Sequence, residues 1–497
     1  MQTIETLLEL LGEVQDLTAA SALLEWDQET YMPPKAAAAR AQQLASLAGI
    51  AHEKLTSPEI GALLGRLREA RGLSEDEQAL VRETARDHDR ARKLPRELVQ
   101  ALARAQSEAL HVWTEAKQAS RFEPFAPHLE RLIALKQEVA RHLGFAEVPY
   151  DALIDDHELG ATTRSVAALF AKLAPELVSL LRAIQASPVP IDARCVQASF
   201  AEDAQIEFAL DVARAMGFDL EAGRLDRSAH PFCTAFHPTD VRLTTRFGEH
   251  DLRPALFGVI HEAGHGLYEQ GLDVAWSRTP LGHPASLGIH ESQSRLWENI
   301  VARSLPFWRH FFPKLKAKFA AQLEPVTLEQ FYRAINQVRP SLIRVEADEV
   351  TYNLHIILRF ELEQQLFAGT LQVRDLPSAW NRRMQQWLGV EPPSDKEGVL
   401  QDIHWAMGAF GYFPTYTLGN VYAAQLFERA QQDLAGLEQG IARGELTPLR
   451  DWLRERVHRQ GRRYPPAQLI ERATGQAPSH EPFVRYLRAK FGAIYRL

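Results

Sequence analysis

DLRPALFGVIHEAGHGLYEQG, from Asp251 to Gly271, is the stretch that decides the fold. Leucine, valine and isoleucine recur in it at helical spacing, so the sequence predicts one buried helix. Pro254 suits the first turn, where a missing N–H costs nothing, and Gly271 suits the end. His261 and His265 stand four residues apart, so both imidazoles face one side and can bind a single metal ion. The helix is therefore predicted to carry a metal site.

Glu262 lies directly after the first histidine and is not a ligand in this pattern. Instead it is placed to take a proton from a water molecule on the metal. Gly264 and Gly266 flank the second histidine, and each costs about 1 kcal/mol relative to alanine inside a helix. This cost indicates that backbone or substrate approaches closely there, or that another helix packs tightly against this one.

A third ligand is expected from the segment that begins His290-Glu291-Ser292-Gln293 and continues as a predicted helix. Catalytic zinc sites use three protein ligands and leave a position for water, and two histidines with one glutamate are a standard set. Glu291 is the predicted third ligand. Glu298 is the alternative, because it lies two turns further along on the same helical face.

Composition and charge exclude several other functions. A chain of 497 residues with 45% hydrophobic side chains can bury a large core. The net charge is −8 and no block of lysine or arginine occurs, so neither nucleic acid nor a membrane is an expected partner. The N-terminus lacks the pattern of a signal peptide. The two cysteines, Cys195 and Cys233, form no CxxC pair, which favours a reducing, cytoplasmic location.

Most of the chain shows helical patterns. The first predicted helix covers residues 3–15, and a capping-box pattern at Ser74 and Glu77 marks the start of a later one. Further helices are expected at several places, including one over residues 305–323 and a long one from Pro340 to about Phe367.

Strand signals occur in one region only, at residues 230–236 and 240–247 and in the short stretch before His290. No internal repeat or flexible linker is found. We therefore expect an all-α class protein, mostly helical, with a small β-sheet next to the metal helix. We expect residues 1–497 to form a single domain, which a groove could divide into two lobes.

Six motifs occur in a fixed order along the chain: His230-Pro231-Phe232, Asp240-Val241-Arg242-Leu243-Thr244, His261 to His265, His290-Glu291-Ser292-Gln293, Ile343-Arg344-Val345-Glu346-Ala347-Asp348 and Gly398-Val399-Leu400-Gln401-Asp402-Ile403-His404-Trp405. With LEWDQETYMPP at residues 24–34, they make the chain resemble the carboxypeptidase Taq family of metallocarboxypeptidases from end to end. The resemblance implies a two-lobed helical fold with a central groove, like that of angiotensin-converting enzyme and thimet oligopeptidase.

The resemblance also implies an activity and its partners. A homodimer is expected, with Zn²⁺ as the cofactor and Co²⁺ or Mn²⁺ as substitutes. The substrates would be peptides with a free C-terminus, from which single residues are removed with broad side-chain tolerance.

Hydrolysis of a peptide bond passes through an oxyanion, which needs the metal and a directed donor. His404 and the tyrosines of GYFPTYT, Tyr412 and Tyr416, are the candidates, because they follow one another in a region rich in glycine and aromatic residues. Tyr416 is preferred over Tyr412 by analogy with related peptidases. The alternative for each tyrosine is a core residue with a satisfied hydroxyl.

A carboxypeptidase must also bind a terminal carboxylate, for which the two-pronged guanidinium of arginine is suited. Arg344 is the first choice, because Asp348 follows one helical turn later and could hold it in place. A purely structural pair of these two residues is the alternative. Arg242 is the second choice. Asp240 and Arg242 share a face of the predicted strand. The family resemblance implies that this motif bounds the groove, where it could restrict substrate length instead.

Two other functions are alternatives to a carboxypeptidase. An oligopeptidase or endopeptidase could use the same scaffold, whereas an aminopeptidase is disfavoured because no GxMEN-type sequence precedes the histidines. A non-catalytic helical protein with a structural metal is disfavoured by Glu262, since a structural site needs no general base and normally has four protein ligands.

Overall fold

The computed structural model describes residues 2–497 and is 68% helical, with one three-stranded sheet. The prediction of a mostly helical fold with a small sheet is confirmed. The chain divides into two compact units. Unit 1 comprises the chain up to Arg92, Ile191–Ile335 and Tyr422–Pro478, and unit 2 comprises Lys93–Pro190, Asn336–Val421 and Ser479–Leu497. The single domain with a groove stays a prediction.

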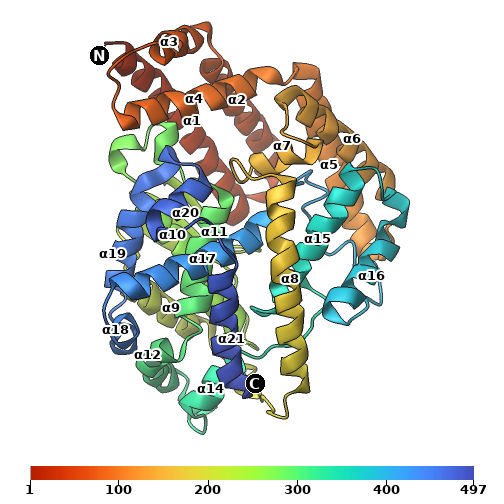
Figure 1. Cartoon of the computed structure of the whole chain (residues 1–497), viewed down its shortest axis with the longest axis vertical. Helices are drawn as coiled ribbons and strands as arrows, with labels where there is room; N and C mark the ends of the chain where they lie inside the picture. Colours follow the sequence, from red (N-terminus) through yellow and green to blue (C-terminus); the bar gives the residue numbers. More distant parts are fainter. Residues whose placement is uncertain (1) are drawn as a thin grey trace. The chain divides into compact units, whose positions relative to one another are not determined.

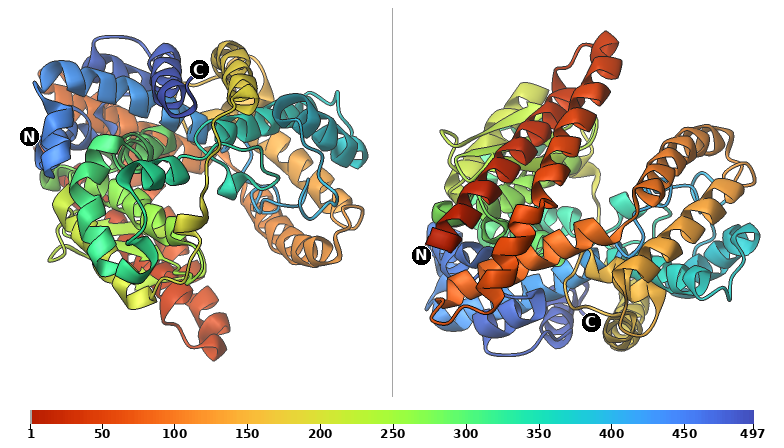
Figure 2. Two further views of the ribbon diagram at one scale, coloured as in Figure 1. Left: turned by 90° about the horizontal axis from the view of Figure 1, so that it is seen from below. Right: turned by 90° about the horizontal axis from the view of Figure 1, so that it is seen from above.

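Unit 1 holds the sheet and most of the helices (Figure 1). Its helices are α1 Gln2–Thr30, α2 Ala37–Leu55, α3 Pro58–Arg68, α4 Glu75–Lys93, α9 Glu202–Met216, α10 Leu252–Glu269, α11 Leu287–Arg295, α12 Leu305–Lys318, α13 Ala320–Leu323, α14 Leu328–Ile335, α18 Leu437–Arg443, α19 Thr447–Arg456 and α20 Pro466–Thr474. The first helix is much longer than predicted, and it pairs with α2 along its side (Figure 2). The helix predicted over residues 305–323 is divided at Phe319 into α12 and α13.

The sheet consists of β1 Gly223–Arg227, β2 Phe232–His237 and β3 Asp240–Thr245 in the order β1-β3-β2. β1 pairs parallel and β2 antiparallel with the central β3, which packs on α10. Two of the three predicted strands are thereby confirmed, next to the predicted metal helix. The third prediction is wrong. The stretch before His290 forms helical turns, and the third strand is GRLDR, whose charged residues gave no strand signal.

Unit 2 is helical throughout its described elements (Figure 1). Its helices are α5 Arg96–Ala119, α6 Ala126–Leu143, α7 Pro149–Asp155, α8 Thr163–Ala186, α15 Thr351–Phe367, α16 Leu376–Leu388 and α21 Glu481–Tyr495, and α21 lies beside α8. α17 Pro414–Asp433 begins in unit 2 and ends in unit 1. Among residues 2–497, no helix has the length and apolar character needed to cross a membrane.

The start of α15 differs from the prediction. The helix begins at Thr351, eleven residues after the predicted start at Pro340, and only a short 3-10 turn, Arg344–Glu346, precedes it. Asp348 explains the late start, because its carboxylate accepts hydrogen bonds from the backbone N–H groups of Val350 and Thr351, both at 3.0 Å. Such an acceptor ends the preceding loop and begins the helix.

Candidate active site

The glycines of α10 allow α11 to pack directly against it. A Cβ atom built on Gly264 would lie 2.7 Å from the Cα of Ser294 and 2.8 Å from the carbonyl oxygen of Gln293. A Cβ on Gly266 would lie 2.6 Å from the ring of Phe218. Tight packing is therefore sufficient to explain both glycines. The close approach at Gly264 brings the helix that carries Glu291 next to the two histidines of α10.

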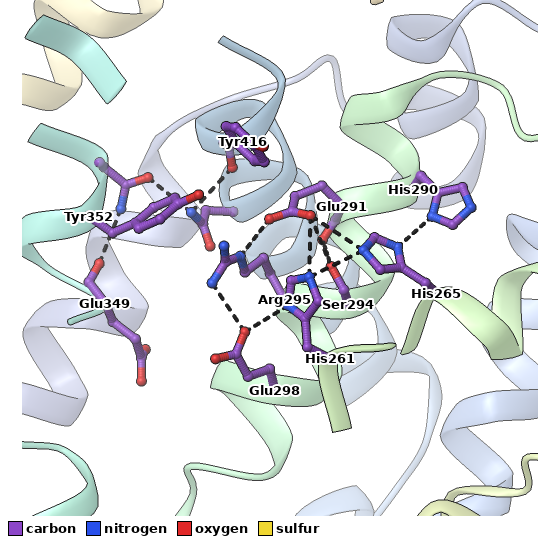
Figure 3. A network of polar contacts seen from close by, with 12 residues as sticks. His261, His265, His290, Glu291, Ser294, Arg295, Glu298, Glu349, Tyr352 and Tyr416 are labelled. Atoms are coloured by element: carbon purple, nitrogen blue, oxygen red, sulfur yellow. Dashed lines mark hydrogen bonds and ion pairs between the residues drawn. The ribbon is translucent and has the colours of Figure 1, made fainter. Parts of the chain in front are cut away.

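Three donor atoms meet between α10 and α11 (Figure 3). The Nε2 atoms of His261 and His265 lie 3.2 Å apart, and Glu291 Oε2 lies 3.7 Å and 3.5 Å from them, respectively. Ligands about 2.0–2.1 Å from a tetrahedral zinc ion are separated by about 3.3 Å, so the three atoms match one face of such a tetrahedron. These residues could hold a zinc ion with a fourth position open.

Glu298 lies on the other edge of the His261 ring. Its Oε2 is 2.9 Å from His261 Nδ1, so it faces away from the three donor atoms. A carboxylate in this place fixes the orientation of a histidine ligand without binding the metal. The geometry thus favours Glu291 over Glu298 as the third ligand, although both glutamates reach the same imidazole.

Arg295 connects the two glutamates. Its Nε donates to Glu291 Oε1 at 2.7 Å and its Nη1 donates to Glu298 Oε2 at 3.1 Å, while Arg303 contacts Glu298 from the other side at 3.3 Å. Burial alone would raise the pKa of Glu291, but Arg295 and His261 lower it well below its usual value. The carboxylate therefore stays ionised, with Oε2 turned toward the histidines. Arg295 was not predicted, since its role depends on two partners from different turns.

Glu262 is 6% exposed and sits beside this cluster. Burial raises the pKa of Glu262 to about 7, a shift that His261 opposes and Glu291 supports. A carboxylate of this basicity can accept and release a proton near neutral pH. Burial also lowers the pKa of His265 to about 3, so its imidazole is neutral, as a metal ligand requires.

Arg242 of β3 is held by three neighbours in unit 1. Its guanidinium bonds the carboxylate of Asp240 at 3.0 Å and 3.1 Å, and lies 4.3 Å and 4.9 Å from the ring centroids of Trp26 and Phe236. The predicted common face of Asp240 and Arg242 is confirmed. The Asp240 carboxylate and the two aromatic rings thus hold the Arg242 guanidinium in place.

Arg344 belongs to a buried cluster in unit 2, but not with the predicted partner. Its Nη2 donates to Asp402 Oδ1 at 2.7 Å and its Nη1 donates to the Tyr352 hydroxyl at 3.1 Å. The structural pair of Arg344 with Asp348 is therefore wrong, because the expected helix does not cover these residues. Arg359, which is fully buried, donates to the other oxygen of Asp402 at 2.7 Å. Sequence reasoning missed Arg359.

His404 and the two candidate tyrosines also come together in unit 2. His404 Nε2 lies 3.2 Å from the Tyr416 hydroxyl, and the Tyr412 ring is 5.4 Å from the rings of both. Burial lowers the pKa of His404 to about 4, so its imidazole is neutral and can donate a hydrogen bond from one nitrogen. The side chain of Arg344 lies 5.2 Å from the Tyr416 ring centroid, which joins this group to the arginine cluster.

Comparison with known proteins agrees with this architecture. The family model described as Carboxypeptidase Taq (M32) metallopeptidase matches residues 6–491. The chain is 47% identical to Thermostable carboxypeptidase 1 of Thermus thermophilus, over 99% of this chain and 98% of that protein. It is 40% identical to Carboxypeptidase 1 of Bacillus subtilis, over 98% of each. The crystal structure of an M32 carboxypeptidase from Deinococcus radiodurans matches with a TM-score of 0.98 and 42% identity over 100% of both chains.

The fold is that of the M32 carboxypeptidases, and the three donor atoms on α10 and α11 could hold a metal ion. The chain belongs to the carboxypeptidase Taq family, and it is a metallocarboxypeptidase that acts on peptides.

Proposed function

We propose that this chain is a zinc-dependent carboxypeptidase that hydrolyses the C-terminal peptide bond of peptides with broad side-chain tolerance. The observation that carries the proposal is the convergence of His261 Nε2, His265 Nε2 and Glu291 Oε2, 3.2–3.7 Å apart, beside the buried Glu262. Zinc suits two imidazoles and one carboxylate, and Co²⁺ or Mn²⁺ could replace it. When bound, the ion supplies a Lewis acid that polarises the peptide carbonyl and makes water acidic.

In this proposal Glu262 is the general base. One of its carboxylate oxygens accepts a proton from the attacking water. Glu262 then delivers this proton to the nitrogen of the leaving amine. A pKa of about 7 supports both steps, because the carboxyl group can be protonated and deprotonated near neutral pH. The burial of Glu262 excludes competing water from its carboxylate.

Arg344 is the proposed partner of the substrate's terminal carboxylate. The charge balance of its cluster supports this role, because Arg344 and Arg359 carry two positive charges against the single negative charge of Asp402. A buried surplus of one positive charge is costly unless an anion binds. Arg242 stays the second candidate, although the carboxylate of Asp240 already balances its charge.

His404 and Tyr416 stay our candidates for the donor to the oxyanion, and Tyr412 for a substrate contact. What supports them is the contact between the neutral His404 imidazole and the Tyr416 hydroxyl at 3.2 Å. A homodimer and a cytoplasmic location belong to the same proposal and rest on the sequence.

Short peptides blocked at either end test the proposed specificity. We expect the zinc-loaded protein to remove single residues from peptides with a free C-terminus, whether or not the N-terminus is acetylated, with products identified by mass spectrometry. Varying the last residue measures the breadth of tolerance. Equal cleavage of free and amidated peptides, or release of internal fragments, would instead identify an oligopeptidase.

A further inference from the structure

A third histidine, His290 of α11, lies behind His265 on the side away from His261 (Figure 3). His265 Nδ1 is 2.5 Å from His290 Nδ1, and His290 Nε2 is 2.7 Å from Glu269 Oε1. The three side chains are 15%, 18% and 16% exposed, so solvent competes little with these bonds. The proposed metal site, two imidazoles and a carboxylate thus form one continuous hydrogen-bonded line.

Only one arrangement of protons fits this line when His265 offers Nε2 to a metal. The lone pair of Nε2 is then used, so the proton of His265 lies on Nδ1 and is donated to His290 Nδ1. His290 must therefore keep Nδ1 as an acceptor and carry its own proton on Nε2, which donates to Glu269. The carboxylate of Glu269 accepts this bond, so each group fixes the tautomer of the next.

The two proposed histidine ligands thereby differ in the hydrogen-bond partner of the ring nitrogen that faces away from the metal site. His261 contacts a carboxylate, that of Glu298, directly at 2.9 Å. His265 reaches the carboxylate of Glu269 only through the ring of His290. That ring lies 4.5 Å from the His265 ring and 5.3 Å from the Tyr268 ring, so packing as well as hydrogen bonding holds it in place.

We propose that His290 and Glu269 are positioning residues, which orient His265 for the metal and increase the electron density on its Nε2. This inference rests on the proposed function, because it takes His265 as a ligand. A hydrogen bond to the outer nitrogen of a ligating histidine fixes its ring and raises its basicity, and losing such a partner typically costs about 10–100-fold in metal affinity.

Four variants test the inference, each measured without any peptide. His290→Leu removes the acceptor for His265, His290→Asn keeps an oxygen close to the position of Nδ1, and Glu269→Gln keeps an acceptor without its charge. His458→Leu is the matched control, because the His458 ring also packs 5.2 Å from the Tyr268 ring but bonds Gln293 at 3.0 Å, not His265. The readouts are Zn²⁺ affinity by competition with a chromophoric chelator and the visible absorption spectrum of the Co²⁺ form.

We expect His290→Leu to weaken Zn²⁺ binding by about 10–100-fold and to alter the Co²⁺ spectrum at saturating metal. His290→Asn should restore part of both, Glu269→Gln should shift both slightly in the direction of His290→Leu, and His458→Leu should lower only the thermal stability. The inference is refuted if His290→Leu binds zinc like the wild type, or if His458→Leu weakens binding as much as His290→Leu does. A wild-type protein that binds no zinc would refute the proposed metal site itself, together with the inference.

Discussion

Two buried polar clusters of this protein differ in how they are built and in the charge they leave unmatched. The metal-site cluster of unit 1, defined by His261, Glu262, His265 and Glu291, gathers lone pairs of nitrogen and oxygen around one point. The arginine cluster of unit 2, defined by Arg344, Arg359 and Asp402, gathers N–H donors around one carboxylate and keeps a positive charge in surplus. The first cluster is suited to a cation and the second to an anion.

This difference supports the ligand proposed for each cluster, because proteins rarely bury polar or charged groups without partners. The acceptors in unit 1 converge with their donors turned outward, toward Glu298 and His290. The donors of the arginine cluster in unit 2 share the single carboxylate of Asp402, which cannot neutralise both guanidinium groups. Substitutions that change one cluster at a time allow metal binding and peptide recognition to be measured separately.

The largest effect is expected for the proposed third ligand. Glu291→Ala should lose the metal at micromolar free Zn²⁺ and reduce peptidase activity to background, since two histidines alone bind weakly. Glu298→Ala is the matched variant, seven residues further along in the π-helical turn Leu296–Val301 that follows α11. It should retain the metal and weaken its affinity by only about 10–100-fold, because Glu298 orients His261 from behind. Metal content after dialysis distinguishes the two, and the reverse pattern would make Glu298 the ligand.

Glu262→Gln should give the next largest effect. The amide cannot accept a proton from water, so kcat should fall by about 10²–10⁴-fold or more. Metal content should stay close to that of the wild type, because Glu262 is not among the three converging donors. Elemental analysis beside single-turnover kinetics checks both quantities. If this variant lost the metal as completely as His261→Ala, the assigned roles would be wrong.

The two clusters also differ in how much of each could be predicted from the sequence. Two of the proposed metal ligands, His261 and His265, lie four residues apart on one helix, so their common face follows from helical geometry alone. The third lies only 26 residues after His265, on the next helix. The helix itself and its buried face were predictable from the same helical spacing.

The arginine cluster is assembled from distant positions, and spacing gives no guide to it. Arg344 and Asp402 are 58 residues apart, and Arg359 and Asp402 are 43 apart. The helix expected from Pro340 placed Arg344 beside Asp348, and the side-chain acceptor that starts α15 at Thr351 overrode this local pattern. The motif was enough to select Arg344 as a candidate, but its partner Asp402 could be identified only in the folded chain.

Peptide recognition gives the third prediction. If Arg344 binds the terminal carboxylate, amidation of a peptide should cost about 2–5 kcal/mol in transition-state binding, the range for removing one partner of a buried charged pair. This corresponds to a loss of roughly thirty- to several-thousand-fold in kcat/KM. Arg344→Ala should cause a similar loss with free peptides and little further loss with amidated ones, because both changes delete the same interaction.

Metal content is the control for this experiment, since Arg344→Ala should leave the cluster of unit 1 intact. Arg242→Ala is the matched arginine variant, and its losses with free and amidated peptides should be equal. If the effects of amidation and of Arg344→Ala simply added, the carboxylate would have another partner, and Arg242 would be examined first.

The smallest effect is expected at Asp348, and it tests the correction made to the sequence prediction. Asp348 accepts four hydrogen bonds: from the N–H groups of Val350, Thr351 and Arg339, each at 3.0 Å, and from the Thr351 hydroxyl at 2.8 Å. Asp348→Ala leaves these donors unpaired and should destabilise the fold by about 1–3 kcal/mol. Asp348→Asn keeps one carbonyl oxygen for the two N–H groups at the start of α15, so it should cost less, about 1 kcal/mol. Thermal unfolding checks this order.

Because Arg344 is held by Asp402 and not by Asp348, the ratio of kcat/KM for free and amidated peptides should stay at its wild-type value in both variants. A fall in that ratio as large as the one in Arg344→Ala would mean that Asp348 supports the guanidinium after all.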